Sequence, residues 1–443
     1  MNDKSVLKGT WAAAFTVASV WFGTHVGGGF ASGNQVIQYY SNYGYTSVIF
    51  PILAMGLLAI VMYIMVKFAK LSGFDNYKDT YAALYPKPWM EVFFEIFYII
   101  IVLAAIASAV AGAGEVLANF IGLNYVGSTK IIMNLIIVAV LIILTIFGIK
   151  LVRAASTVLS LAIIVITALL VVFGLTTDYD SIAAQITSQH NLQLAEYTNN
   201  VGSAIWKGVL VYAGFQCVSI PPMIAASKDL SLKGVKKAHI LGWLMNGLAL
   251  AASGWMLTKW YPLLASMQTA GKEFLAAGSG SPLVAYANAL GIPNQTVLDL
   301  IGIKWLLVAF SVLLFCAFMS TCVTLVYTLI QRFEGKFFPK TIKNDKVRGV
   351  FVAAIVIAIC FGISLLGLTD IVKFAYGYDG YYALLVIVIP AFVWGIPKIR
   401  KLQAATAMLL ICLTIACPFE AELVSVSQVA FMVCCSKAYC LAS

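Results

Sequence analysis

The feature that most constrains this chain is a series of long apolar runs, repeated from one end of its 443 residues to the other. A helix needs about 20 predominantly apolar residues to cross a bilayer, and a backbone in hydrocarbon must satisfy its own hydrogen bonds. Hydrophobic residues make up 62% of the chain and charged residues only 10%, whereas soluble domains carry about one-quarter charged residues. We therefore predict an all-α polytopic membrane protein with a single membrane domain over residues 1–443.

The apolar runs predict about eleven transmembrane helices, near 11–37, 45–66, 90–118, 130–148, 152–174, 201–226, 238–260, 300–330, 349–367, 374–396 and 402–417. We divide them into a first repeat over 11–174, a second repeat over 201–396 and an extra C-terminal span over 402–417. The tail, 418–443, is atypical, because its apolar stretch is too short to cross a bilayer.

Basic residues define the predicted orientation. Of the 28 Lys and Arg residues, 21 fall into six groups that an alternating path through the membrane places on one side. The groups are Lys4 with Lys8, 67–87, Lys150 with Arg153, 228–237, 332–348 and 398–401. Because cytoplasmic loops are enriched in Lys and Arg, we predict a cytoplasmic N-terminus in the cytoplasmic (inner) membrane. The net charge of +10 then reflects topology, so we expect the lipid bilayer and no nucleic acid as a partner.

Two predicted spans have unusual compositions for transmembrane helices. The first holds four glycines between Gly27 and Gly33, each costing about 1 kcal/mol of helix propensity relative to alanine. The sixth contains two successive prolines, Pro221 and Pro222, which lack N–H donors. We predict that both helices break near mid-membrane, at Gly28 to Ser32 and at Gly214 to Ser219. The alternative is that the glycines serve close helix packing and the prolines a kink.

The order of these two spans indicates an inverted repeat. They are the first and the sixth, so five spans separate their starts. A unit of five helices repeated in tandem enters the membrane the second time from the opposite side, because five is odd. Many secondary transporters have such repeats, with broken helices at corresponding positions and the substrate site between them. The pattern therefore predicts a five-plus-five arrangement whose broken helices surround a binding site.

Residues 23–35, GTHVGGGFASGNQ, resemble the first-helix signature G-T-x-V-G-A-G-F-A-S-G-Q-E of the YkvI-type amino-acid permease family. The resemblance implies the amino acid, polyamine and organocation transporter superfamily and the LeuT-type fold. It also implies secondary active transport of a small polar solute, an amino acid or a related zwitterion, by alternating access. Asn34 and Gln35 stand where the signature has Gln and Glu. This difference removes a carboxylate near the break and argues against a proton carrier there.

A broken membrane helix frees backbone N–H groups on one side and carbonyls on the other, and a polar solute can bind to both. The N–H groups suit a carboxylate, and the carbonyls suit an ammonium group or a cation. Glycines let the ligand approach the backbone, and aromatic side chains are expected to form apolar walls or, alternatively, to lie in the core or face lipid. The predicted substrate-binding residues are Gly27, Gly28, Gly29, Phe30, Ala31, Ser32, Gly33, Tyr212, Gly214, Phe215 and Gln216.

The resemblance also assigns a cation site. In sodium-coupled members of the superfamily, adjacent hydroxyl residues of helix eight bind Na⁺ together with carbonyls of broken helix one, and Ser320 and Thr321 occupy the middle of this span. Na⁺ is therefore the expected coupling ion, and H⁺ is the alternative. Oxygen ligands suit a hard cation, although Ser and Thr in membrane helices often bond back to a carbonyl one turn earlier.

Ionisable residues inside the predicted spans are candidates for gating or coupling. They are His25, Glu115, Lys207 and Asp379. Glu115 or Asp379 would form an outer gate with Lys207. His25 would either titrate during transport or be hydrogen-bonded within the helix bundle, and we favour the second interpretation.

Other functional classes are less well supported. The main alternative is a ligand-sensing membrane subunit with a transporter-like fold, of the germinant-receptor type, which would need no coupling ion. No filter-like or charged ring pattern indicates a channel. No nucleophile–base pair or metal-ligand spacing is visible, and the nine cysteines lie mostly in apolar runs, so we expect no enzyme, no cofactor and no metal apart from Na⁺. These features leave the oligomeric state open.

The orientation can be tested by cysteine labelling. Single cysteines introduced at Lys78 and Lys343 lie in predicted cytoplasmic loops, so a membrane-impermeant maleimide added to intact cells should not label them. A permeant maleimide should label both, which controls for expression and accessibility. Efficient labelling by the impermeant reagent would invert the predicted topology.

Overall fold

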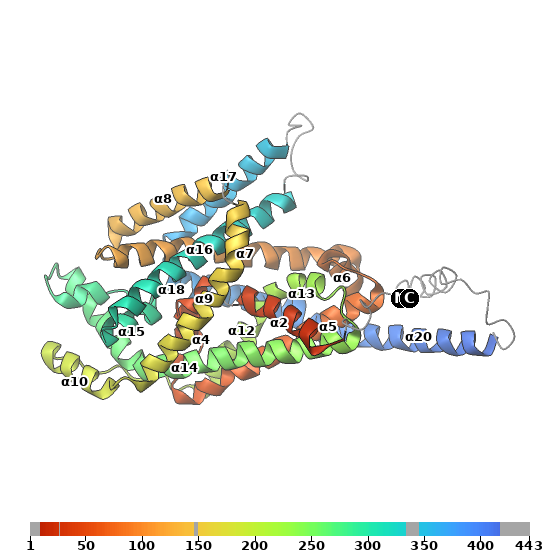
Figure 1. The fold of residues 1–443 in the computed structure, drawn as a ribbon, viewed down its shortest axis with the longest axis horizontal. Coiled ribbons are helices and arrows are strands. Elements are labelled where there is room, and N and C mark those ends of the chain that lie inside the picture. Colours follow the sequence, from red (N-terminus) through yellow and green to blue (C-terminus); the bar gives the residue numbers. More distant parts are fainter. Residues whose placement is uncertain (1–8, 26, 146–148, 334–344, 417–443) are drawn as a thin grey trace.

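The computed structural model describes residues 9–25, 27–145, 149–333 and 345–416, and the predicted tail lies outside them. Within these ranges all regular elements are helices, most of them aligned with the long axis of the molecule (Figure 1). The first half contains α2 (Trp11–His25), α3 (Gly28–Ala31), α4 (Asn34–Tyr39), α5 (Phe50–Ser72), α6 (Tyr77–Leu84), α7 (Val92–Phe120), α8 (Gly127–Ile143), α9 (Ile149–Thr176) and α10 (Tyr179–His190). The second half contains α11 (Val201–Ile205), α12 (Tyr212–Phe215), α13 (Ile220–Ala226), α14 (Leu232–Ala276), α15 (Pro293–Ile301), α16 (Lys304–Phe333), α17 (Asp345–Ser364), α18 (Leu368–Asp370), α19 (Gly377–Ala383) and α20 (Ile396–Ala416).

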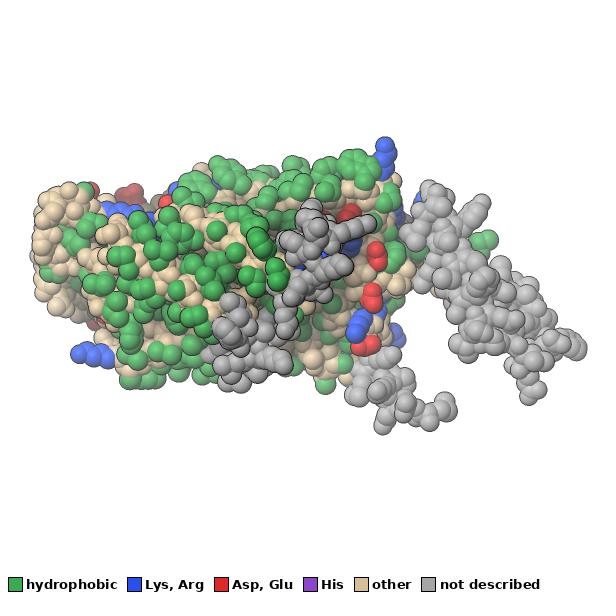
Figure 2. Space-filling model, turned by 90° about the horizontal axis from the view of Figure 1, so that it is seen from above, with side chains coloured by type: hydrophobic (Ala, Val, Ile, Leu, Met, Phe, Trp, Pro, Cys, Tyr) green, Lys and Arg blue, Asp and Glu red, His purple; other side chains and the backbone are tan. Residues whose placement is uncertain are grey.

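The described helices form a multi-pass membrane protein. Seven continuous helical segments in the described ranges are long and apolar enough to cross a membrane, and there are eight if the pair α9–α10, bent by 73°, counts as one span. The first span is broken, so its longest helix, α2, has only 15 residues, and α8 has only 17. Figure 2 shows hydrophobic side chains over most of one side of the molecule, with charged side chains gathered towards its ends. This distribution fits a belt of lipid around the helices.

The helices pack in two groups that the inverted repeat predicts. In one group, the long helix α14 lies against α2 and α5, and α13 contacts both of these helices. These elements belong to spans one, two, six and seven. In the other group, α7, α8, α16 and α17 pack against one another, and they are spans three, four, eight and nine. Corresponding helices of the two halves therefore occur in the same group.

The last two predicted spans require a correction. The helix that begins at Leu368 continues through α19 into α20 without a turn, so 402–416 extends span ten and does not form a separate eleventh span. The basic segment 398–401 looked like a loop because it interrupts the apolar run. Lys and Arg are good helix formers, however, and the helix continues through this segment.

The sixth span also differs from the prediction. Its backbone stays helical from Val201 to Ala226, with a π-helical segment at Trp206–Val211 and a 3-10 turn at Gln216–Ser219. The break expected at Gly214 to Ser219 is therefore a change of helical pitch and not a gap. Gly214 packs directly against the backbone carbonyl of Gly380 in α19, where a β-carbon would collide. Its role is close helix packing, the alternative weighed above.

The basic groups converge at one end of the bundle, which we call the basic end. Lys237 donates to the carbonyl of Gly9 at 2.9 Å, which joins the start of α14 to the N-terminal region. Lys70 donates to the carbonyl of Ser227 at 3.1 Å, and Lys398 donates to Ala83 at 2.7 Å. These bonds bring together four segments that the charge pattern placed on one side.

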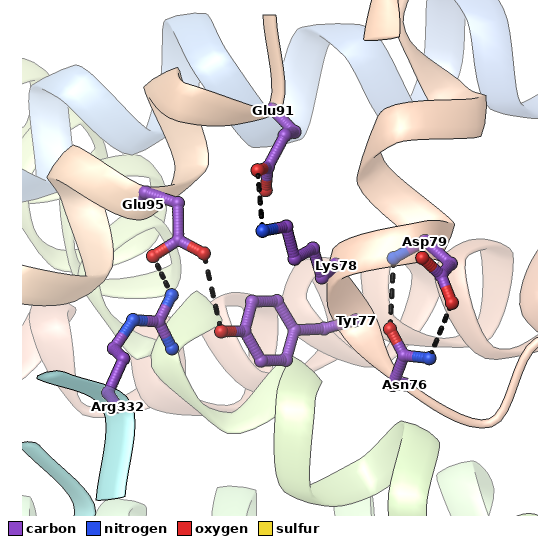
Figure 3. Close-up of polar contacts among 7 residues, drawn as sticks. All are labelled: Asn76, Tyr77, Lys78, Asp79, Glu91, Glu95 and Arg332. Carbon is purple, nitrogen blue, oxygen red and sulfur yellow. Dashed lines mark hydrogen bonds and ion pairs between the residues drawn. The ribbon is translucent and has the colours of Figure 1, made fainter. Parts of the chain in front are cut away.

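A charged and aromatic cluster, the basic-end clamp, joins α6, α7 and α16 (Figure 3). Arg332 forms an ion pair with Glu95, and Tyr77 donates to the same carboxylate at 3.4 Å. The guanidinium lies 5.0 Å from the ring centroids of both Tyr77 and Tyr98. Arg332 and Glu95 are 10% and 16% exposed, so this pair is much less screened by solvent than a surface ion pair.

We expect the partly buried Arg332–Glu95 ion pair to stabilise the protein more than the Lys78–Glu91 ion pair, which is more exposed. Arg332→Gln should lower the thermal unfolding midpoint of the detergent-solubilised protein, because it leaves Glu95 without a counter-charge at a cost of about 3 kcal/mol. Lys78→Gln is the matched control, since Lys78 is 49% exposed in its 3.5 Å pair with Glu91 (Figure 3), and such pairs contribute about 0–1 kcal/mol. Equal midpoints for the two variants would contradict a stabilising role for the clamp.

Candidate functional site

The first span breaks where its glycines predict. α2 ends at His25, and α3 covers only the turn Gly28–Ala31. α4 begins at Asn34 after Gly33, whose φ of 85° lies in the left-handed region that favours glycine. Two interruptions therefore flank one short helix, and the predicted break near Gly28 to Ser32 is confirmed.

Phe318 of α16 holds the short helix α3 in position. Its ring is fully buried and packs directly on the backbone of Gly28 on one side and of Gly112 in α7 on the other. A β-carbon at either glycine would collide with the ring. Gly28 therefore lets the broken segment lie close to the α7–α16 pair, a contact that the sequence did not reveal.

Asn294 of α15 bonds to the carbonyls that the second interruption leaves open. Its backbone N–H donates to the carbonyl of Ser32 at 3.1 Å, and its side-chain amide donates to Ala31 at 2.9 Å. Asn34 donates in turn to the carbonyl of Leu290, in the loop before α15, at 2.8 Å. Unpaired backbone groups are costly in a membrane interior, so these bonds stabilise the break. They also connect the first span to α15 and to the loop that precedes it.

A central cavity of about 640 Å³ lies between the broken first span, α7, the sixth span and α16, a size typical of small-molecule sites. It extends from the break towards the basic end, where Tyr98 of the clamp and Thr328 line it. The lining residues are Gly23, Thr24, His25, Gly27, Gly28, Gly29, Phe30, Gln35, Tyr98, Ile101, Val102, Ala105, Ser108, Ala109, Ile163, Phe215, Gln216, Val218, Pro221, Pro222, Ala317, Ser320, Thr321, Thr324, Leu325, Thr328 and Tyr376.

The predicted substrate-binding residues divide into two sets. Those that line the central cavity are Gly27, Gly28, Gly29, Phe30, Phe215 and Gln216. Those that do not are Ala31, Ser32, Gly33, Tyr212 and Gly214. The N–H groups of the first three of these bond to carbonyls within the same segment, at 2.9 to 3.0 Å. They therefore have no free donor for a carboxylate, which corrects the prediction that this stretch binds one.

The wall formed by α7 was missed in the sequence analysis. Ile101, Ala105, Ser108 and Ala109 lie on one face of this helix and line the central cavity. Small residues at this spacing are also typical of packed membrane helices. The pattern alone could not distinguish a cavity wall from a helix interface.

The predicted cation ligands lie beside the first interruption. Ser320 and Thr321 line the central cavity, and a β-carbon at Gly27 would lie 3.9 Å from the Thr321 hydroxyl oxygen. Gly23 and Thr24, at the C-terminal end of α2, line the same region. A helix leaves its last carbonyls unpaired, and its dipole makes this end negative. The negative end of the α2 dipole and the hydroxyl residues Ser320 and Thr321 therefore border the same part of the central cavity.

His25 belongs to a buried hydrogen-bond network across three spans. Its Nδ1 lies 2.7 Å from Oδ1 of Asn246, and its Nε2 lies 3.0 Å from the hydroxyl of Tyr212. The Tyr212 hydroxyl donates to Oε1 of Gln35 at 3.3 Å. The imidazole is 4% exposed, and both of its nitrogens have partners. This environment matches the interpretation of His25 as a residue hydrogen-bonded within the bundle.

Aromatic rings close the central cavity on the side away from the basic end. The Tyr212 ring lies 5.4 Å from that of Tyr39, 5.2 Å from that of Tyr40 and 4.8 Å from that of Phe215, measured between ring centroids. All four side chains are buried. Tyr212 is thus part of a seal next to the cavity and not of its wall.

The proposed outer gate is not formed. Lys207 is exposed, whereas Glu115 and Asp379 are only 1% and 2% exposed. Neither carboxylate forms an ion pair with a cation within the described ranges. Lys207 lies in the π-helical segment of the sixth span and points away from the core. Glu115 instead lies against the backbone of Gly291, in the loop before α15.

Comparisons with known proteins identify the fold. No family model and no curated protein matches the chain. The structure of MhsT in complex with L-phenylalanine is similar, with 16% identity, coverage of 96% of this chain and 97% of that one, and a TM-score of 0.50. A mutant Eremococcus coleocola manganese transporter (13% identity, 99% and 94% coverage, TM-score 0.49) and a Na⁺-coupled sialic acid symporter (16% identity, 98% and 96% coverage, TM-score 0.48) are also similar. The likeness to MhsT, together with the helix groups described above, shows that the chain has the LeuT-type fold.

Proposed function

We propose that the chain is a secondary active transporter of a small polar solute, an amino acid or a related zwitterion, that works by alternating access. The observation that carries this proposal is the central cavity, which is lined by the broken first span and reaches towards one end of the bundle only. Hydrogen bonds from Asn294 and Asn34 close the other end. A site at a helix break that is accessible from one side at a time is what alternating access requires.

The two ends of the broken span support binding of opposite charges. The C-terminal end of α2 presents carbonyls next to Thr321 and suits a cation. On the other side of the interruption, Gly28, Gly29 and Phe30 form the first turn of α3, and the leading N–H groups of a helix have no acceptor within that helix. In this proposal these N–H groups bind the substrate carboxylate, because those of Ala31, Ser32 and Gly33 bond within their own segment. A zwitterion could contact both ends at once.

Na⁺ is the coupling ion in this proposal. The oxygen atoms available near Gly27 are hydroxyls and backbone carbonyls, which are ligands that hard cations prefer. The side chain of His25, the titratable group nearest the break, is engaged with Asn246 and Tyr212. These contacts support Na⁺ over a proton carried on the first span.

The proposal is tested by uptake into proteoliposomes. The purified protein is reconstituted, and uptake of a panel of radiolabelled amino acids is measured with an imposed Na⁺ gradient, an imposed pH gradient or neither. Gradient-driven accumulation of at least one amino acid above protein-free liposomes supports transport. Amino-acid binding without uptake under any gradient would favour the ligand-sensing alternative.

Replacement of both hydroxyls on α16 tests the Na⁺ site. Ser320→Ala with Thr321→Ala should abolish Na⁺ stimulation of uptake, because the cation loses its side-chain ligands while the carbonyls alone remain. Thr269→Ala in α14 is the control, since its exposed hydroxyl bonds back to the carbonyl of Ala265 at 3.0 Å and Thr269 does not line the central cavity. The proton alternative would be established by two results together. Uptake by the unmodified protein would be independent of Na⁺ and driven by a pH gradient, and His25→Gln would lose this uptake.

A further inference from the structure

The central cavity lacks charged side chains. Its lining contains no Asp, Glu, Lys or Arg among the residues that the structure describes. The two buried carboxylates of the spans, Glu115 and Asp379, do not line it. At the mouth, the charges of Arg332 and Glu95 pair with each other. A bound solute therefore finds polar groups here but no counter-charge on a side chain.

Polar and apolar groups are unevenly distributed over the walls of the central cavity. Thr24, Gln35 and Thr321 are contributed by the first span and α16. The α7 wall is mainly aliphatic, and the hydroxyl of its Ser108 already donates to the carbonyl of Ala105 at 3.0 Å and lies 3.1 Å from the hydroxyl of Tyr376. Phe30 and Phe215 add aromatic surface. Ala105 is partly accessible although it lies in the middle of a span, as expected for a residue that faces the cavity. A solute that matches this arrangement has one polar end and one apolar end.

We infer that the central cavity selects amino acids with uncharged, apolar side chains, which lie against the α7 wall. This inference rests on the proposed function and adds the substrate class. The amino and carboxyl groups of a zwitterion carry no net charge and can be matched by helix ends. A third charge on the substrate side chain would lose its water without gaining a partner, which is costly in a buried site.

The same lining argues against a transition-metal ion as the transported solute. Transition metals are bound by carboxylate, thiolate, thioether or several imidazole ligands. His25 is the one residue of these types in the described lining, and both its nitrogens are already bonded. No group of three or more His, Cys, Asp or Glu residues that could hold a metal occurs in the described parts of the chain.

A competition panel tests the selectivity of the unmodified protein. Unlabelled leucine and phenylalanine should inhibit uptake of the transported amino acid at concentrations at least about tenfold lower than lysine or glutamate, a difference of about 1.4 kcal/mol. Mn²⁺ should not compete. Inhibition by lysine or glutamate at the leucine concentration, or competition by Mn²⁺, would overturn the inference while leaving transport itself intact. Absence of uptake of any amino acid would instead refute the proposed function.

A designed change of charge provides a second, independent test. Ala105→Asp places a carboxylate on the α7 wall and should weaken inhibition by leucine and strengthen inhibition by lysine, each at least about tenfold. Ala105→Asn has nearly the same shape without the charge and should not favour lysine. The shift of the thermal unfolding midpoint on adding leucine or lysine, measured in detergent, should rank the two amino acids in the same order without requiring transport. An equal response of the two variants to lysine would overturn the assignment of the α7 wall to the substrate side chain.

Discussion

The structure depends on one constraint, which is that every backbone polar group buried in a membrane must find a partner. The glycines after His25 end the first helix, and the groups freed by this interruption have to be matched elsewhere. Asn294 matches the carbonyls of Ala31 and Ser32 from a helix far away in the sequence. Near the other interruption, the end of α2 and the start of α3 border the central cavity. The break therefore has a structural cost and also borders the central cavity.

The same contacts make the two ends of the molecule different. At one end, the loop before α15 and the aromatic rings around Tyr212 cover the break. At the other end, the cavity reaches Tyr98, next to the clamp of Arg332 and Glu95. Alternating access would exchange these roles. The elements that would move relative to each other are the two helix groups, between which the broken span lies.

Sequence reasoning was most successful where a single residue type decides the local structure. Clustered glycines located the break in the first span, because glycine weakens a helix wherever it occurs. It was less successful for Gly214 and its following prolines, where the same residue types serve packing against Gly380 and a change of pitch. It also separated spans ten and eleven at basic residues that the structure keeps in one helix. Composition indicates a weak point in a helix, but the neighbours decide whether the helix opens.

The sequence by itself determined the membrane character, the grouping of basic loops on one side and the position of the first helix break, because these depend on local composition and on the thickness of a bilayer. Only the tertiary structure decided which residues meet at the break. Asn294, Phe318 and the α7 wall lie far from the glycines in sequence, and their roles arise from packing between helices. Such contacts cannot be recognised from the neighbouring sequence, because a buried Asn, Phe or Ala occurs both at helix interfaces and in the walls of cavities.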